Sequence, residues 1–220
     1  NPASGDLLFF SNNAVTGSIL KIFTSSDFNH NGIAVRIDQD GKVVEKGGFL
    51  YVLEVNSGAR PDILTSNSVY GIALTSQEYI FCKYNRVAVR SLREIYRTTI
   101  LERTLGYIKE NHGIQFSSDA RTFIGAWLGV PMKKSENTLY CSEMSVLYYS
   151  YCLGKKVDDM FLYSHIPYLY TPKILSNTDS TVLEGYLKDI YIKYSSPGES
   201  LISTSIVCVF ILIFIAMMIR

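Results

Sequence analysis

This sequence of 220 residues is poor in the side chains that hold metal ions and build disulfide frameworks. It has four cysteines and three histidines, and no two cysteines have the CxxC spacing of a zinc site or a redox motif. The cysteines are Cys82, Cys141, Cys152 and Cys208. We therefore expect no metal, no cofactor and no dense disulfide framework, and the small number of cysteines favours a reducing compartment.

The sequence also lacks the charge and glycine patterns of nucleic-acid and nucleotide binding. Its 21 Lys and Arg residues nearly balance its 20 Asp and Glu residues, and the formal net charge is +1. Proteins bind phosphate backbones through clustered positive charge, and this chain has no basic run. It has no glycine-rich phosphate loop either. We expect neither a nucleic-acid partner nor a nucleotide.

One long uncharged segment lies near the C-terminal end. Residues 201–219 read LISTSIVCVFILIFIAMMI, and Arg220 follows. About 20 apolar residues in a helix cross the hydrocarbon core of a bilayer, whereas a helix of that length in a soluble core would have a polar face. The pattern predicts a single-pass tail anchor that binds the bilayer. The remainder then lies on one side of the membrane, most simply in the cytosol.

Apolar alternation in the first half of the chain predicts an antiparallel sheet of about five strands. The expected strand segments are Gly5–Phe10, Gly32–Ile37, Lys42–Val44, Phe49–Val55, Gly71–Leu74 and Tyr79–Val89, the last broken near Asn85. From Ser91 to Gly113 apolar residues recur at helical spacing. Further helices are expected at Ser118–Leu128 and at Val182–Tyr194. Another is expected to begin after Asn137 or Thr138, either of which can cap it, and to end at Leu153-Gly154-Lys155-Lys156.

These elements predict an α+β fold in which the antiparallel sheet packs against helices. A hydrophobic content of 47% is enough for one good core. We expect one globular domain over residues 1–176, a juxtamembrane helix and linker over 177–200, and the transmembrane anchor over 201–219.

Cys141 is the candidate nucleophile. It lies in Tyr140-Cys141-Ser142-Glu143, where a loop meets the first turn of a predicted amphipathic helix. The free N–H groups and the positive end of the helix dipole stabilise a thiolate there, and they can also hold an oxyanion. Tyr140 and Ser142 are candidates for the oxyanion hole or the substrate pocket.

A thiolate nucleophile needs an imidazole base, and His30 is the best placed of the three histidines. It opens a predicted strand on which Ile33 and Val35 share one face, while Gly32 and Ala34 share the face of His30. These small residues leave room for a helix to approach the imidazole. The other two histidines have structural interpretations: His112 as a solvated cap at a helix C-terminus, and His165 as a packing or rim residue of an aromatic loop.

Glu54 is the candidate for the group that orients the imidazole. Alternation along Tyr51-Val52-Leu53-Glu54-Val55 places a carboxylate within an otherwise apolar strand. Such a residue is expected to be paired or functional. A carboxylate at a strand edge that faces water remains the alternative. Cys82 and Cys152 are expected to be small core residues, and Cys208 lies within the apolar run.

In the order His30, Glu54, Cys141, the chain resembles the circularly permuted branch of the NlpC-type papain-like thiol hydrolases. That superfamily includes bacterial, poxviral and lecithin retinol acyltransferase-like members. The matching segments are Gly5–Phe10, the His-x-Gly-Ile strand at His30, the Val-Leu-Glu strand ending at Glu54, the Tyr-Cys-Ser-Glu helix start at Cys141, and Tyr-x-Pro at Pro172. Together they cover most of residues 5–172.

The resemblance implies a cysteine hydrolase of the peptidase or amidase type. His30 would be the base, Glu54 would orient it, and Cys141 would attack an acyl carbonyl, with its own N–H in the oxyanion hole. Acyltransferase-like members have Asn-Cys-Glu-His around the nucleophile and use a second histidine as the third group, so amide or peptide hydrolysis is favoured over lipid acyl transfer.

Two other interpretations stay open. The C-terminal anchor is similar to that of the acyltransferase group, which keeps a lipid acyl hydrolase or acyltransferase in view. A catalytically idle structural protein of a membrane or virion with the same fold is the second alternative, because the family has poxviral members.

Overall fold

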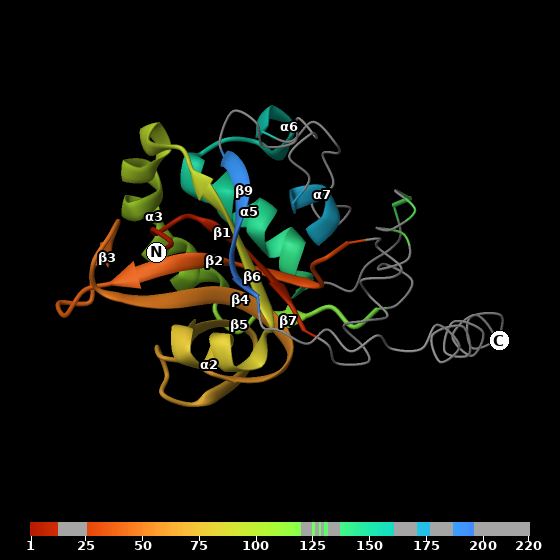
Figure 1. The fold of residues 1–220 in the computed structure, drawn as a ribbon, viewed down its shortest axis with the longest axis horizontal. Helices are drawn as coiled ribbons and strands as arrows, with labels where there is room; N and C mark the ends of the chain where they lie inside the picture. The colour runs from red at the N-terminus through yellow and green to blue at the C-terminus, as the bar shows by residue number, and fades with distance from the viewer. Residues whose placement is uncertain are drawn as a thin grey trace.

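A computed structural model describes residues 1–12, 26–119, 137–160, 171–176 and 187–195, together with Gly125, Leu128, Val130 and Pro131 (Figure 1). The predicted helix at Ser118–Leu128 falls mostly outside these residues, and the expected membrane anchor at 201–219 falls wholly outside them. None of the helices in the described part of the chain is both long enough and apolar enough to cross a membrane.

The central element is an antiparallel sheet of seven strands. Its strands are β1 (Leu7–Ser11), β2 (His30–Ile37), β3 (Val43–Val44), β4 (Phe49–Pro61), β5 (Ser68–Ser76), β6 (Arg86–Leu92) and β9 (Leu187–Ser195). The strand order is β5-β4-β2-β1-β6-β9, and β3 pairs with β2. Strands β7 (Gln115–Phe116) and β8 (Thr138–Leu139) form a separate short parallel pair.

Helices cover both faces of this sheet (Figure 1). They are α2 (Gln77–Lys83), the 3-10 turn η1 (Glu94–Tyr96), α3 (Arg97–Asn111), α5 (Cys141–Leu153), α6 (Val157–Met160) and α7 (Pro172–Ser176). Residues Ile33 and Val35 of β2 belong to a large core with α3 and α5, whereas Ala34 belongs to a smaller core with Ile80 of α2. A mixed fold with an antiparallel sheet packed against helices, as the sequence predicts, is thus confirmed.

Two predicted elements have the wrong type. The segment from Tyr79 to Tyr84 was expected to begin a strand but lies in α2 and its C-cap, although the expected break near Asn85 does separate α2 from β6. The Ser76 side chain accepts a hydrogen bond from the Tyr79 N–H, which caps the helix and outweighs the β-forming composition. Packing of Ile80 into the smaller core adds to this preference.

The second wrong element is the connecting helix expected over Val182–Tyr194. Leu187–Ser195 is instead strand β9, which pairs antiparallel with β6 at the edge of the main sheet. With β9 at one edge, the sheet has seven strands, where the sequence predicts about five. Pairing with a distant strand decided the structure of this segment, and a local pattern does not contain that information.

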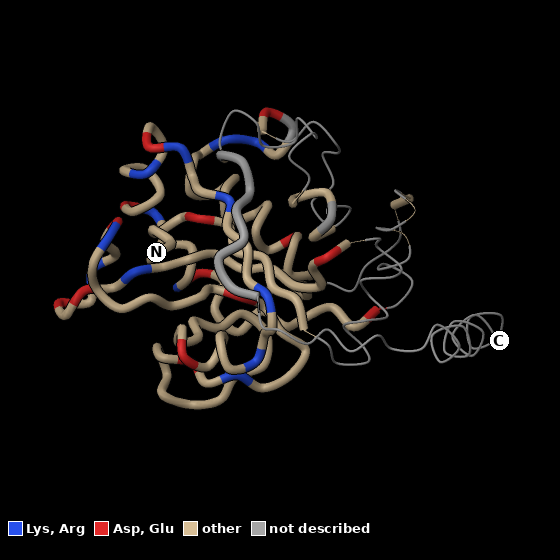
Figure 2. The backbone as a smooth tube through the Cα atoms, viewed as in Figure 1, with Lys and Arg blue, Asp and Glu red and all other residues tan. Residues whose placement is uncertain are grey.

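Charges of both signs are distributed over the described elements (Figure 2). Several of the buried charges hold chain segments together. Arg97 binds the Asp6 carboxylate at 3.0 Å, and the guanidinium of Arg36 donates to the carbonyls of Pro2, Gly47 and Gly48. These contacts attach the N-terminal segment to the sheet and to α3.

Gly71 is required where β5 meets the segment after α3. Its φ is +96°, and a Cβ at this position would collide with the Ile114 carbonyl. Gly41 also has a positive φ, of +78°, but a Cβ there would meet nothing. Gly71→Ala is expected to lower the free energy of unfolding by about 2–5 kcal/mol, whereas Gly41→Ala loses about 1 kcal/mol from backbone strain alone. Urea denaturation of both variants measures the difference, and equal losses would contradict the steric argument.

Candidate active site

Cys141 is the first residue of helix α5, and Tyr140 occupies the N-cap position. The sequence predicted that the helix would start after Asn137 or Thr138, but Thr138–Leu139 forms β8 and Asn137 has a φ of +56°. The Tyr140 N–H donates to the Glu143 carboxylate at 3.1 Å, so Glu143 caps the first turn. The N–H of Cys141, in the first turn, has no acceptor within the helix and points along its positive end.

An asparagine fixes the start of α5 to strand β2. Asn31 is fully buried, and its Nδ2 donates to Ser145 Oγ at 2.6 Å and to the Cys141 carbonyl at 3.2 Å. The helix of Cys141 therefore packs against the face of β2 that carries Asn31, Ile33 and Val35. The small residues Gly32 and Ala34 predict that the helix approaches on their face, but that space is filled by Val52 and by α2.

His30 lies at the start of β2, opposite Phe10 of β1. Its Nε2 is 2.7 Å from Glu54 Oε2, and interaction with the Cys141 side chain raises the pKa of the ring. Since Nε2 is occupied by Glu54, the ring nitrogen left for Cys141 is Nδ1. The Tyr84 ring stacks on the imidazole, with centroids 5.7 Å apart and planes inclined by 10°. The imidazole is therefore held on three sides.

Glu54 is completely buried in strand β4, so it is not a strand-edge carboxylate that faces water. His30 faces Oε2, whereas Oε1 accepts a hydrogen bond from Thr75 Oγ1 at 3.2 Å and lies 3.5 Å from Arg60 Nε. Burial alone would raise the pKa of Glu54, but the hydrogen bond and charge of His30, the side chain of Asn56 and the charge of Arg60 together outweigh it. The pKa of Glu54 is lowered, and the carboxylate is ionised.

The same contacts control the charge of the imidazole. Burial lowers the pKa of His30, but hydrogen bonds to Cys141 and Glu54, together with their negative charges, raise it to about 9. The imidazolium is then the stable form at neutral pH, and it faces Glu54 through one nitrogen and Cys141 through the other. An imidazolium beside a thiol stabilises the thiolate, which is the reactive form of cysteine.

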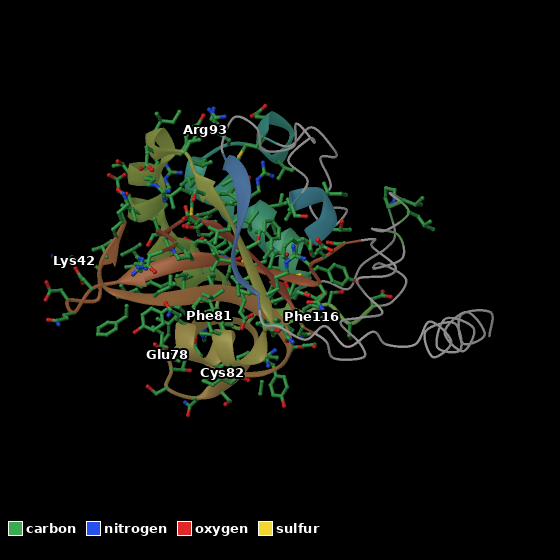
Figure 3. The ribbon with its side chains drawn as sticks, in the orientation of Figure 1. Lys42, Glu78, Phe81, Cys82, Arg93 and Phe116 are labelled. Carbon is green, nitrogen blue, oxygen red and sulfur yellow. The ribbon has the colours of Figure 1, made fainter. Side chains whose placement is uncertain are left out.

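The structure thus brings Cys141, His30 and Glu54 together from three separate elements, α5, β2 and β4. The pocket candidates lie beside them. Ser142 is buried in the first turn of α5, and the Tyr140 hydroxyl donates to the Asp119 carbonyl at 2.6 Å while its ring packs against Phe116, labelled in Figure 3. Both donors of Tyr140 therefore already have acceptors.

Three further residues of the site are not apparent from the sequence: Thr75, Tyr84 and Arg60. Thr75 lies on strand β5 and is paired with Val52 of β4, next to Glu54. Tyr84 was assigned to a strand, but it follows α2 and stacks on His30. Arg60 lies beyond the expected end of its strand. A carboxylate buried in a strand must have hydrogen-bonding or charged partners, so the sequence indicates that partners of Glu54 exist. It does not show which residues they are.

The predictions for the remaining histidines and cysteines are confirmed for some residues and wrong for others. His112 is the C-cap of α3 as expected, but its Nε2 lies 3.0 Å from the buried Asp62 carboxylate, so it is paired rather than simply solvated. Cys152 is buried as predicted. Cys82 was expected in the core but is exposed on α2 (Figure 3). His165 and Cys208 lie outside the described residues. Among the described residues, no group of three or more His, Cys, Asp or Glu side chains has the geometry of a metal site.

Comparisons with known proteins show little similarity. No family model matches the chain, and no curated protein matches it. Among solved structures, it is similar to the metalloprotein yiiX of Escherichia coli O157:H7, with 17% sequence identity and a TM-score of 0.45. That match covers 71% of this chain and 69% of the other.

The ion pair predicts a pH-dependent stability. The pKa of His30 is about 9 in the folded protein and about 6.5 in the unfolded chain, so its contribution is complete below pH 6.5 and is lost as the pH rises through 9. The stability difference between wild type and His30→Gln is expected to shrink by about 2–3 kcal/mol between pH 6 and pH 9.5. Urea denaturation across this range measures it. A difference that does not vary with pH would mean that His30 is neutral in the folded protein.

Proposed function

We propose that this protein is a thiol hydrolase that cleaves an amide or peptide bond. The observation that carries this proposal is the buried series of contacts from Cys141 through His30 to Glu54. A nucleophile, a base and a group that orients the base are what acyl-enzyme chemistry needs, and the nucleophile lies at a helix N-terminus. Within this proposal, the fold belongs to the permuted papain-like type, in which the histidine precedes the cysteine.

In the first half of the reaction, the Cys141 thiolate attacks the carbonyl carbon of the substrate. The negative charge then moves to the carbonyl oxygen, where the Cys141 N–H at the start of α5 donates a hydrogen bond. His30 Nδ1–H gives its proton to the leaving nitrogen, and the C–N bond breaks. The amine departs, and the acyl group remains on Cys141 as a thioester.

In the second half, His30 accepts a proton from water as the water oxygen attacks the thioester carbonyl. The C–S bond breaks, the carboxylic acid is released, and the thiolate and imidazolium form again. Glu54 holds Nε2 throughout, so the ring presents the same nitrogen to the substrate in both halves. This orientation role does not require Glu54 to change its protonation state.

A lipid acyl hydrolase or acyltransferase remains the alternative. It would use the same three residues and differ only in the acyl group and in the acceptor. The apolar run at residues 201–219 favours it, because a membrane anchor would hold the site beside lipid substrates. A catalytically idle membrane or virion protein is the remaining possibility, and the reactivity of Cys141 separates it from both enzymes.

The first test is the reactivity of Cys141 toward iodoacetamide as a function of pH, read by mass spectrometry of the Cys141 peptide. The wild-type Cys141 thiol is expected to react readily at neutral pH, because the neighbouring imidazolium stabilises the thiolate. His30→Ala is expected to lower this reactivity. Cys141→Ala supplies the blank, and the exposed Cys82 serves as an internal reference for an ordinary thiol.

A second measurement tests directly for the acyl-enzyme. Incubation with p-nitrophenyl acetate is expected to release p-nitrophenol in a burst and to leave an acetyl group on Cys141, and neither should occur with Cys141→Ala. Peptide amides and phospholipid vesicles are then compared as acyl donors. A Cys141 thiol of ordinary reactivity that is indifferent to His30 would reject both enzymes and leave the idle protein.

The proposed anchor has a separate test. Full-length protein is expected to float with phosphatidylcholine vesicles in a density gradient, because the apolar run would insert into the bilayer. A variant that ends at residue 200 is expected to remain at the bottom of the gradient. Flotation of both proteins, or of neither, would contradict an anchor at residues 201–219.

A further inference from the structure

Glu54 has a second charged neighbour that the proposed mechanism does not use. Arg60 Nε lies 3.5 Å from Glu54 Oε1, and the other oxygen, Oε2, faces His30. Arg60 is 8% exposed and Glu54 is 0% exposed, so solvent ions screen this contact little. A guanidinium does not lose its proton in proteins, and the site therefore contains one permanent positive charge.

Arg60 reaches Glu54 because strand β4 is irregular between them. In a regular strand, residues six positions apart are separated by about 20 Å, which is too far for their side chains to meet. Here Asn56 pairs with Gly71 and Arg60 with Val69, so β4 contains two more residues than β5 over the same interval. This bulge bends β4 and returns the Arg60 side chain toward Glu54.

Other contacts hold the guanidinium in place. Its NH2 group donates to Asn56 Oδ1 at 2.8 Å, and its NH1 group donates to the Ala59 carbonyl at 3.3 Å. The Tyr79 ring of α2 lies against it, with the ring centroid 5.7 Å from the guanidinium carbon. Nε has no hydrogen-bond partner among the described residues, and its nearest carboxylate is Glu54. The cation is thus fixed beside the triad rather than free to turn into solvent.

We propose that Arg60 is a positioning residue, whose fixed charge keeps Glu54 ionised and directed at His30 through the reaction. This role matters only if the proposed thiol chemistry is correct. When His30 gives its proton to the leaving amine, Glu54 loses its cationic partner for that step. A buried carboxylate without a cation tends to take up a proton. Arg60 remains charged throughout, so Glu54 stays an acceptor and the imidazole keeps its orientation.

The charged and titratable groups that face this pair come from four elements. They are Cys141 of α5, His30 of β2, Glu54 and Arg60 of β4, and Tyr79, Lys83 and Tyr84 of α2 and its C-cap. Burial raises the pKa of Tyr84 far above its ordinary value, so it stays neutral. Burial and the charge of Arg60 lower the pKa of Lys83, and the charge of Glu54 opposes them only in part.

The test is an NMR titration of the His30 imidazole in the full-length chain in detergent micelles. The protein has three histidines, and the His30 signal is the one that His30→Gln removes. Its shift is expected to change once at alkaline pH, as His30 loses its proton, and again at acidic pH, as Glu54 gains one. In Arg60→Met, the acidic change is expected one pH unit or more higher, because the neighbouring cation is gone.

Three further variants make the result specific. Arg60→Lys keeps the charge and is expected to return the acidic change most of the way to the wild-type pH. Arg60→Gln keeps a polar side chain without the charge. It replaces Arg60→Met in the titration if Arg60→Met does not fold. Arg36→Met removes an equally buried arginine whose guanidinium donates to three main-chain carbonyls, and it is expected to leave the pH of both changes unaltered.

Two results would be informative in opposite ways. If folded Arg60→Met and Arg60→Gln show the acidic change at the wild-type pH, Arg60 only packs the bulge and the proposal is wrong. If the change moves but Cys141 forms no acyl-enzyme, the role of Arg60 stands and the thiol hydrolase is rejected. The titration reads Glu54 and His30 directly, so the two failures are distinguishable.

Discussion

The rest of the site depends on one buried contact, the 2.7 Å pair between His30 Nε2 and Glu54 Oε2. A carboxylate in the interior is costly unless it is paired and hydrogen-bonded, and here a cation, a hydroxyl and a second cation surround it. Pairing commits one ring nitrogen of His30 and turns the other toward Cys141. The orientation and the charge of His30 thus follow from the same contact.

The strand pairing places this contact near the first turn of α5. Ile33 of β2 lies opposite Leu53 of β4, so the strand carrying His30 and the strand carrying Glu54 are adjacent. A Cβ on Gly32 would meet Val52 and the Leu53 carbonyl, so the lack of a side chain at Gly32 keeps the two strands close. Asn31 then hydrogen-bonds the first turn of α5 from the opposite face of β2. Neighbouring residues of one strand therefore position both His30 and Cys141.

Helix α2 closes the site from the other side of the sheet. Tyr84 stacks on His30 and on Phe10, and Tyr79 lies against the Arg60 guanidinium. These aromatic rings exclude water from the ion pairs, and electrostatic interactions are stronger where water is excluded. A helix that the alternation of apolar residues did not predict therefore shields the charges of the site.

The sequence by itself determined the features that depend on interactions between residues close together in the chain. Alternation placed His30 and Glu54 on strands, the approach to Cys141 indicated a helix start, and Gly154, with a φ of +63°, ends that helix as expected. The chain order of the three candidate residues could also be read directly. Their proximity could not, because it depends on which strands pair and on which face each helix packs.

Only the tertiary structure decided the elements whose partners are distant. Leu187–Ser195 is a strand because β6 offers it an edge, and Tyr84 follows a helix because Ser76 caps that helix and Ile80 packs into a core. Arg60 contacts Glu54 because β4 bulges against β5. Local propensity differs by about 1 kcal/mol or less among most residues, and pairing or packing with a distant segment outweighs it.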